Sequence, residues 1–213
     1  MKVNEKVAGV PALWEAICTQ GDTVAFEKLF HLLYQRLINF CDLYVHQREA
    51  AEEIVADVFV KCWIKKSELQ QVNKPEVYLF VAVKNGALNY LKSFSSYRIT
   101  SIDACTQIVN AETYPERELE KKELFLKMNK AIAALPQQCQ VIFRLVREDG
   151  MSYKEVAEIL SISPRTVQTQ LCRAVKKLSH VLQGYADYPH SVFRDETGIS
   201  ILLFLFLNFF SLL

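Results

Sequence analysis

Two short helical patterns joined by a tight turn occupy residues 152–178, and they constrain the fold of this chain most strongly. The first pattern begins with Ser152 and has Glu155 three residues later, which is the capping-box arrangement of a helix N-terminus. Pro164 then opens the second helix, at a position where its missing N–H costs nothing. Ser161 stands where such turns commonly have glycine, so it must adopt a less favourable backbone conformation or the turn must differ slightly. The pattern predicts a helix-turn-helix; the alternative is an αα-hairpin with a solvated basic face.

The second helix of this pair has two different faces. Its apolar residues recur at helical spacing and are expected to face a core. They are Val167, Leu171, Ala174, Val175 and Leu178. The opposite face is polar and basic, and no acidic residue occurs from Pro164 to Leu178. Such a face suits phosphates and base edges of DNA. The candidates for base edges or the adjacent backbone are Arg165, Thr166, Gln168 and Thr169, and those for phosphates are Arg173 and Lys176.

The composition is that of a globular protein, with 51% apolar and 23% charged residues in a chain of 213. Six glycines and six prolines are few for this length, and the long runs have helical periodicity, so we expect an all-α fold. The net charge of +1 indicates that basic charge is local and balanced by acidic surface elsewhere.

The sequence gives no sign of a catalytic or metal site. The six cysteines are far apart and the four histidines share no metal-ligand spacing, which argues against zinc and a disulfide framework. The cysteines are Cys18, Cys41, Cys62, Cys105, Cys139 and Cys172, most of them expected in helix cores. No nucleophile–base pair or phosphate-binding glycine loop is recognisable, so we expect neither an enzyme nor a cofactor. Without a secretory signal at the amino terminus, a reducing cytoplasm is the expected location.

Helical pattern and turn-prone sequence alternate along the chain and predict four parts. A helical bundle is expected at 11–95, and a polar, flexible linker at 96–118. A second small helical domain at 119–183 contains the helix-turn-helix pattern. The extension at 184–213 ends in a run of apolar residues from Ile199 to Leu213.

Three motifs occur in an order that is typical of one protein family. They are AAEEIVADVFVKCW (Ala50 to Trp63), KPEVYLFVAVKNGALNYLK (Lys74 to Lys92) and the segment from LPQQCQ to CRAVKKL (Leu135 to Leu178). Together they resemble the core-docking segment, the minus-10 helix and the minus-35 domain of a bacterial extracytoplasmic-function sigma factor. The resemblance implies two helical domains that bind core RNA polymerase and promoter DNA and direct transcription initiation. It also implies an anti-sigma factor as regulator, and a linker that either runs through the polymerase or is a plain tether.

An acidic strip in the first motif is the candidate polymerase-binding surface. Its residues are Glu49, Glu52, Glu53 and Asp57, and only Arg48 is available nearby to balance them. Such a strip can steer toward a basic partner, and in sigma factors that partner is the clamp coiled coil. An ordinary solvated face is the alternative.

Melting of a promoter calls for a basic surface with amide groups that can hydrogen-bond an unstacked base. The candidates for minus-10 contacts are Lys65, Lys66, Asn73, Lys84, Asn85, Asn89 and Lys92. Asn89 replaces the aspartate that is frequent in the family, which leaves the minus-10 base preference open. Of the nearby aromatic residues, Trp63, Phe80 and Tyr90 are expected in the core, and Tyr78 is left undecided.

The apolar run at 199–213 is 15 residues long, whereas a membrane span needs roughly 20. It is therefore expected to pack on the helical domains, to associate weakly with a membrane or to engage a membrane partner. Two rivals to the sigma factor remain: a helix-turn-helix regulator that forms no holoenzyme, and a membrane-associated interaction protein. The acidic strip and the basic-amide helix favour the sigma factor, because an autonomous regulator needs neither.

Overall fold

The computed structural model describes residues 9–95, 126 and 128–182, and every regular element within them is helical. The predicted all-α fold is confirmed for this part of the chain. None of the helices described there is both long enough and apolar enough to cross a bilayer. Three of the expected features lie outside the described residues: the linker at 96–118, Cys105 within it, and the extension at 184–213.

The described residues form two compact units that alternate along the chain. The first comprises 9–95 and 148–164, and the second comprises 126, 128–147 and 165–182. The four parts expected from the sequence, at 11–95, 96–118, 119–183 and 184–213, stay a prediction.

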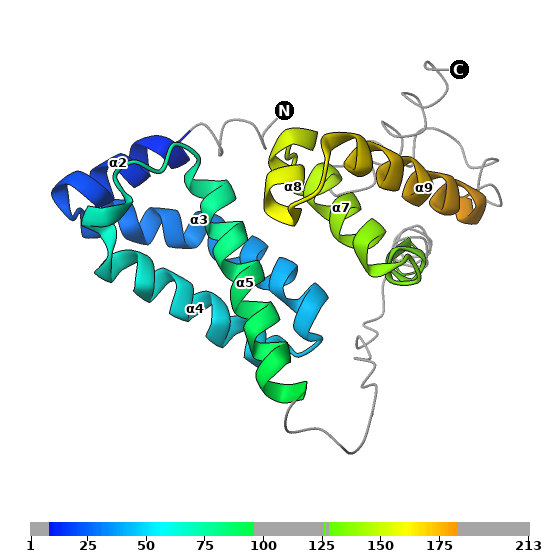
Figure 1. Ribbon diagram of the computed structural model, residues 1–213, viewed down its shortest axis with the longest axis horizontal. Helices are drawn as coiled ribbons and strands as arrows, with labels where there is room; N and C mark the ends of the chain where they lie inside the picture. Colours follow the sequence, from blue (N-terminus) through cyan, green and yellow to red (C-terminus); the bar gives the residue numbers. More distant parts are fainter. Residues whose placement is uncertain (1–8, 96–125, 127, 183–213) are drawn as a thin grey trace, which may run out of the picture. The chain divides into compact units, whose positions relative to one another are not determined.

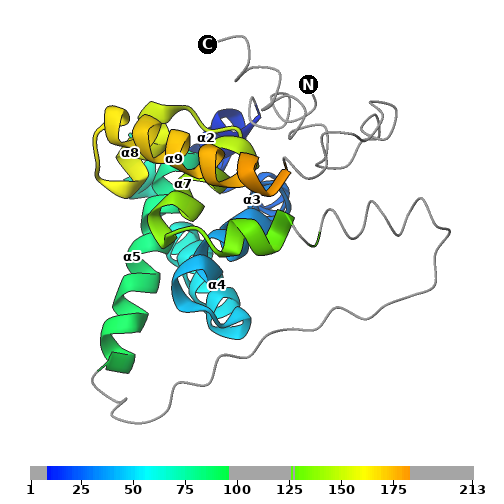
Figure 2. The ribbon, with the colours of Figure 1, turned by 90° about the vertical axis from the view of Figure 1, so that its right-hand side faces the viewer.

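The first unit is a helical bundle (Figure 1). Its helices are α2 (Val10–Gln20), α3 (Thr23–Val45), α4 (Arg48–Ile64), α5 (Pro75–Ser95) and α8 (Tyr153–Leu160), with a short 3-10 helix η1 (Lys66–Leu69). Helix α3 packs against α2, α4 and α5, and α5 also packs against α4 and α8. Figure 2 shows α5 from a second side.

The ends of α3 follow from local chemistry. The Asp22 carboxylate accepts hydrogen bonds from the backbone N–H groups of Val24 and Ala25 at 2.8 and 3.1 Å, which satisfies two amides that a helix N-terminus leaves without partners. Gly21 precedes this cap with a φ of 65°, a conformation that glycine adopts without strain. These two residues set the sharp change of direction between α2 and α3.

Apolar residues of α3 and α5 form the centre of the bundle. Leu33, Leu37, Leu79 and Phe80 are fully buried. The ring of Phe80 also lies edge-on to that of Phe40 at 5.0 Å. Burying a side chain of this size contributes about 1.5–3 kcal/mol, so this centre fixes the orientation of α5 and hence of its exposed face.

The loop between α4 and α5 is fastened to α2. The Trp14 indole N–H donates to the Leu69 carbonyl at 3.2 Å, and the Gln70 side-chain amide donates to the Cys18 carbonyl at 3.2 Å. These bonds position the segment that contains Lys65, Lys66 and Asn73.

The second unit contains a helical segment at 128–133, α7 (Gln137–Arg147) and α9 (Pro164–Leu182) from its second residue on. Its buried residues include Ile142 and Leu145 on α7. On α9, Val167, Leu171, Ala174 and Leu178 are buried as predicted, and Val175 is half-buried. The buried face of α9 leaves its polar face accessible.

The described cysteines are mostly core residues, as expected. Cys18, Cys41, Cys62 and Cys139 are buried, whereas Cys172 is exposed. Burial raises the pKa of the Cys41 thiol to about 12, with a smaller contribution from Asp42. Within the described residues no group of histidine, cysteine or acidic side chains could hold a metal ion.

Candidate nucleic-acid interface

The start of α8 has the predicted capping box. The Ser152 hydroxyl accepts a hydrogen bond from the Glu155 backbone N–H at 3.3 Å. In return, the Ser152 backbone N–H donates to the Glu155 carboxylate at 2.8 Å. This reciprocal pair satisfies two exposed amides and fixes where the helix begins.

The turn after α8 shows how the chain accommodates serine in place of glycine. Ser161 has a φ of 58°, in the left-handed region. The backbone N–H groups of Ser161 and Ile162 donate hydrogen bonds to carbonyls in the last turn of α8. The expectation that Ser161 adopts a less favourable conformation is confirmed. Helix α9 then begins at Pro164, as the sequence predicts.

The polar face of α9 presents the residues proposed for DNA in one row. Arg165, Gln168, Thr169, Arg173 and Lys176 are exposed, and each lies three or four residues from another of them, which puts them on one side of the helix. Thr166 is half-buried beside them. The Thr169 hydroxyl donates to the Arg165 carbonyl at 2.9 Å, so this side chain is held along the helix.

Cys172 lies within this row, three residues after Thr169 and one before Arg173, and it is exposed. The sequence did not single it out, because cysteine is usually buried. The spacing of its neighbours could have placed it, since positions 165, 168, 169, 172 and 176 share one face.

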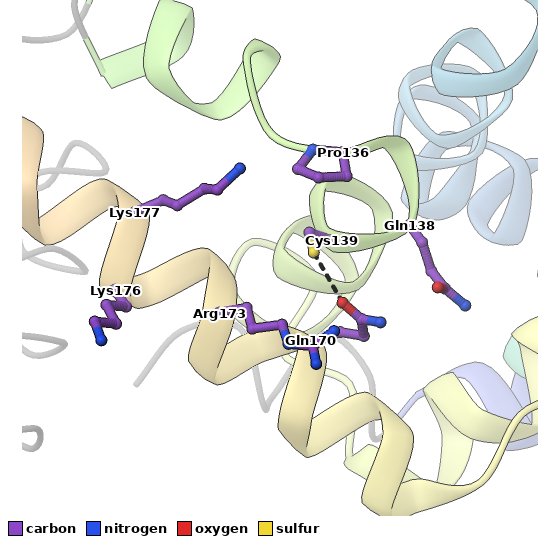
Figure 3. A pocket seen from close by; sticks show the side chains of 7 residues that line it. All are labelled: Pro136, Gln138, Cys139, Gln170, Arg173, Lys176 and Lys177. Atoms are coloured by element: carbon purple, nitrogen blue, oxygen red, sulfur yellow. Dashed lines mark hydrogen bonds between the residues drawn. The ribbon is translucent and has the colours of Figure 1, made fainter.

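A cavity of about 590 Å³ borders this row (Figure 3). It is lined by Pro136, Gln138 and Cys139 near the start of α7 and by Gln170, Arg173, Lys176 and Lys177 of α9. The Cys139 thiol donates to the Gln170 side-chain oxygen at 3.0 Å, shown as the dashed line in Figure 3. The three cations along this hollow make it electropositive, which suits a phosphate backbone.

Helix α5 has a second polar surface. Asn85, Asn89 and Lys92 are exposed, and their spacing places them on one face of the helix. Lys65 and Asn73 are exposed in the segment before α5, near its start rather than near Lys92. The candidates for minus-10 contacts therefore extend along the helix instead of forming one cluster.

Two of the predicted cations make contacts inside the protein. Lys66 lies over the Trp63 ring at 4.4 Å and donates to the Trp63 carbonyl at 3.3 Å. Lys84 donates to the Ile159 carbonyl and, at 3.3 Å, to the Ser161 hydroxyl at the end of α8. Burial lowers the pKa of Lys84.

The aromatic side chains near α5 make ring contacts within the bundle. Phe80 is buried and Trp63 is half-buried, with its ring 4.9 Å from that of Phe26. The Tyr90 hydroxyl donates to the Gln47 side chain at 3.2 Å. Tyr78, which the sequence leaves undecided, has its ring 5.9 Å from that of Trp14.

The acidic strip lies on α4, but not all of it faces the same way. Glu49, Glu53 and Asp57 recur every four residues and are exposed. Glu52 is half-buried and pairs with Arg48 at 3.0 Å. Asp57 lies 3.7 Å from Lys61. The strip is therefore partly balanced by local cations.

The sequence missed an apolar continuation of this strip. Val60 and Ile64 follow Asp57 on the same face and are 56% and 70% exposed. Their exposure could not be read from the sequence, because apolar residues at helical spacing normally predict a core. Helix α4 thus presents acidic and apolar groups together, a combination suited to protein docking.

Comparisons with known proteins agree with this arrangement. The family model "Sigma-70 region 2" matches residues 29–96, and "Sigma-70, region 4" matches residues 125–178. The chain is 26% identical over 152 residues to RNA polymerase sigma factor YlaC of Bacillus subtilis, covering 70% of this chain and 87% of the relative. It is 23% identical over 175 residues to the ECF RNA polymerase sigma-E factor of Escherichia coli K12, covering 77% and 90%.

Solved structures show the same fold. One is sigma factor RpoE in complex with the anti-sigma factor NepR from Bartonella quintana, with a TM-score of 0.58 and 19% identity over 76% of this chain and 98% of that one. Another is CnrH in complex with the cytosolic domain of CnrY, with a TM-score of 0.53 and 19% identity over 80% and 96%.

The two matched regions and the relatives define a protein of the sigma-70 class. The chain belongs to the extracytoplasmic-function (ECF) sigma factors. It is therefore a DNA-binding transcription factor that binds RNA polymerase and directs promoter recognition. The comparisons give no support to membrane association of the apolar run at 199–213.

Proposed function

We propose that this sigma factor contacts its promoter through two separate surfaces, one on α9 and one on α5, and docks on core polymerase through α4. The observation that carries this proposal is the polar face of α9: exposed Arg165, Gln168 and Thr169 in one row with Arg173 and Lys176 and no acidic side chain among them. A DNA duplex presents phosphates and base edges to such a face.

For the minus-35 element, residues at the start of α9 contact base edges or the adjacent backbone, and those further along contact phosphates. The first group is Arg165, Thr166, Gln168 and Thr169, and the second is Arg173 and Lys176. The electropositive hollow beside Arg173 supports the phosphate role.

For the minus-10 element, the exposed amides of Asn85 and Asn89 hydrogen-bond an unstacked base, and the nearby cations contact the backbone. These cations are Lys65, Lys66, Lys84 and Lys92, and Asn73 adds an amide in the loop before α5. An amide side chain has both a donor and an acceptor, which suits the edge of a flipped base.

For polymerase binding, Glu49, Glu53 and Asp57 provide the charge that attracts a basic partner, with Glu52 beside them, and Val60 and Ile64 provide apolar area. Apolar contacts supply affinity at a docking surface, whereas charges mainly raise the association rate. The parts at 11–95 and 119–183, joined by the linker at 96–118, would then act on one promoter together.

The regulator is an anti-sigma factor, as in the two complexes that share this fold. The protein acts by binding alone, without covalent chemistry, and in the cytoplasm, where core polymerase and the chromosome are found. Of the two rivals, a helix-turn-helix regulator without a holoenzyme is the one that a DNA-binding face alone would also fit.

Run-off transcription with purified core polymerase tests the proposal. Genomic fragments serve as templates, and core polymerase alone is the control. We expect new transcripts with defined starts only when the protein is added. A protein that binds duplex DNA tightly by itself and never confers initiation on core polymerase would be a regulator instead.

A further inference from the structure

The hollow between the start of α7 and the later turns of α9 is both apolar and cationic. Most of the surface that lines it is apolar, because Pro136 and the methylene stems of the long side chains of α9 contribute carbon atoms. Its charged groups are Arg173, Lys176 and Lys177, and none of the described residues that line it is acidic. In Figure 3 the Lys177 side chain extends from α9 toward Pro136. The hollow therefore suits a segment that has both apolar and acidic side chains.

One segment of this chain has that composition. The run from Ile199 to Leu213 has only three polar residues, Ser200, Asn208 and Ser211. An acidic pair, Asp195 and Glu196, comes just before it. A continuous apolar surface of this kind is rarely left in contact with water. We infer that the beginning of the run docks in the hollow between α7 and α9, with the acidic pair against its cations.

Residues 183–198 connect α9 to the run and are long enough for this docking. An extended chain spans about 3.3 Å per residue, so this segment reaches up to about 50 Å. Lys176 and Lys177 lie in the last two turns of α9, which ends at Leu182, so the hollow is only about 9 Å back along the helix. Docking within one chain is also an intramolecular event, which gives the run a high effective concentration at the hollow.

Charge favours the hollow over the exposed apolar side chains of α4. Val60 and Ile64 are exposed there, but Glu53 and Asp57 lie on the same helix and are exposed as well. The acidic pair would meet like charges at α4, which is unfavourable. It meets opposite charges at the hollow, so the two surfaces differ in the sign of their interaction with the same segment.

The docked run covers groups that the proposed function assigns to DNA. Arg173 and Lys176 are the proposed phosphate contacts of α9, and both line the hollow. A docked run and a DNA duplex therefore compete for the same cations. This competition rests on the minus-35 role proposed for α9, whereas the docking itself does not.

The test compares three forms of the full-length chain. The run variant is Leu203→Ser with Phe204→Ser, which removes two apolar side chains from the beginning of the run. The matched control is Val192→Ser with Phe193→Ser, which removes a similar pair from the connecting segment. Neither variant changes the acidic pair or a proposed DNA-binding residue, and both are compared with the wild type.

Carbodiimide crosslinking tests the docking, because this reagent joins a carboxylate to a lysine only where the two are in contact. Mass spectrometry identifies the joined peptides. We expect crosslinks from the acidic pair to Lys176 or Lys177 in the wild type and in the control, and at least a fivefold lower yield in the run variant.

Binding of a labelled DNA duplex of mixed sequence to the free protein at low salt tests the competition. We expect the run variant to bind about fivefold more tightly than the control, which corresponds to a run that is docked in about four of every five molecules. Equal duplex binding by the two variants would overturn the competition, because the docked run would then leave the phosphate contacts accessible.

Absence of these crosslinks in the wild type would overturn the docking and leave the hollow to DNA alone. An equal yield in the run variant would also overturn it, because nearness in sequence would then explain the crosslinks. An equal mixture of isotopically heavy and light chains identifies the occupant: heavy-to-light crosslinks would mean a second copy instead. Crosslinks from the acidic pair to Lys61 would mean that the run covers α4 instead.

Failure of the proposed function is seen separately, as an absence of run-off transcripts with core polymerase. That assay uses the wild type alone, and the crosslinks to Lys176 and Lys177 do not depend on its result.

Discussion

Arg36 joins three parts of the first unit through a single side chain. It pairs with Glu76 and Asp149 and lies 5.7 Å from the centre of the Phe80 ring. Arg36 and both carboxylates are mostly shielded, with side chains 24% and 14% exposed. The two carboxylates tolerate this shielding because the guanidinium is between them.

Arg36→Met should therefore destabilise the protein by about 3 kcal/mol at neutral pH, because two shielded carboxylates lose their common partner. Burial raises the pKa of Glu76 although Arg36 opposes that shift, so removing Arg36 raises it further. A raised carboxyl pKa favours the folded state at low pH, and this stability is lost as pH rises through the pKa. The deficit of the variant should shrink as pH falls.

Urea unfolding of wild type and variant across a range from neutral to mildly acidic pH measures this difference. A deficit that is constant with pH would mean that Arg36 acts through packing on Phe80 alone.

Gly86 allows α4 and α5 to approach closely. A Cβ at this position would lie 2.8 Å from the Ile54 Cγ2 atom of α4, so the Ile54 side chain or one of the helices would have to shift. Gly86→Ala should cost about 1 kcal/mol, since overpacking of about 1–3 kcal/mol exceeds the gain of about 1 kcal/mol in helix propensity. Urea unfolding provides the measurement.

Ile54→Ala removes the opposing methyl group, so in that background Gly86→Ala should no longer be destabilising. A stabilising effect of Gly86→Ala in the wild type would show that the helices separate without cost.

At the scale of elements, the long helices were predictable and their surroundings were not. The motifs from Ala50 to Trp63 and from Lys74 to Lys92 correspond to α4 and α5, because amphipathic periodicity is strong over many turns. The 3-10 helix η1 has too few residues to show a period, and its position depends on distant bonds from Trp14 and Gln70. The packing of α8 on α5 likewise depends on residues far apart in sequence.

Part of the candidate site was also predictable from the sequence, and part was not. The row on α9 follows from spacing and from the absence of acidic residues. The hydrogen bonds from Lys84 to the end of α8 could not be predicted, because a sequence pattern does not show which distant residue a lysine side chain contacts. The exposure of Val60 could not be predicted either, because it depends on which side of α4 the bundle covers.

Val60→Ser should weaken binding to core polymerase about tenfold without altering stability, because Val60 is 56% exposed in the free protein and would be buried in the complex. Val24→Ser is the matched control, since Val24 is 55% exposed on α3. Affinity for core polymerase can be measured with labelled sigma factor. Equal losses in both variants would argue against a docking role of the α4 face.

Arg165→Ala should weaken minus-35 recognition about tenfold, a loss of one good base contact, and leave affinity for core polymerase unchanged. Arg173→Ala should instead weaken binding to all sequences alike and lower the salt slope of binding by about one. Holoenzyme binding to promoter DNA at several salt concentrations separates the two effects. Loss of polymerase affinity along with DNA affinity would count against this division of roles.

At the scale of the whole molecule, the α5 and α9 surfaces are far apart in sequence and belong to two different units. Each surface has few of the proposed base-reading groups, so we expect each alone to give little discrimination between promoters. Joined by one chain and held by polymerase, the second contact becomes effectively intramolecular, which raises the affinity for the correct spacing of the two elements.

The central claim, that α9 holds the duplex while α5 holds the opened strand, is tested most directly by permanganate reactivity of promoter thymines under saturating holoenzyme. The Arg165→Ala variant should reach wild-type thymine reactivity once the holoenzyme concentration is high enough to saturate the promoter. Asn85→Ala with Asn89→Ala should leave the minus-10 thymines unreactive even on a filled promoter. If both variants lose reactivity in proportion to occupancy, the two surfaces do not have separate roles and the claim is wrong.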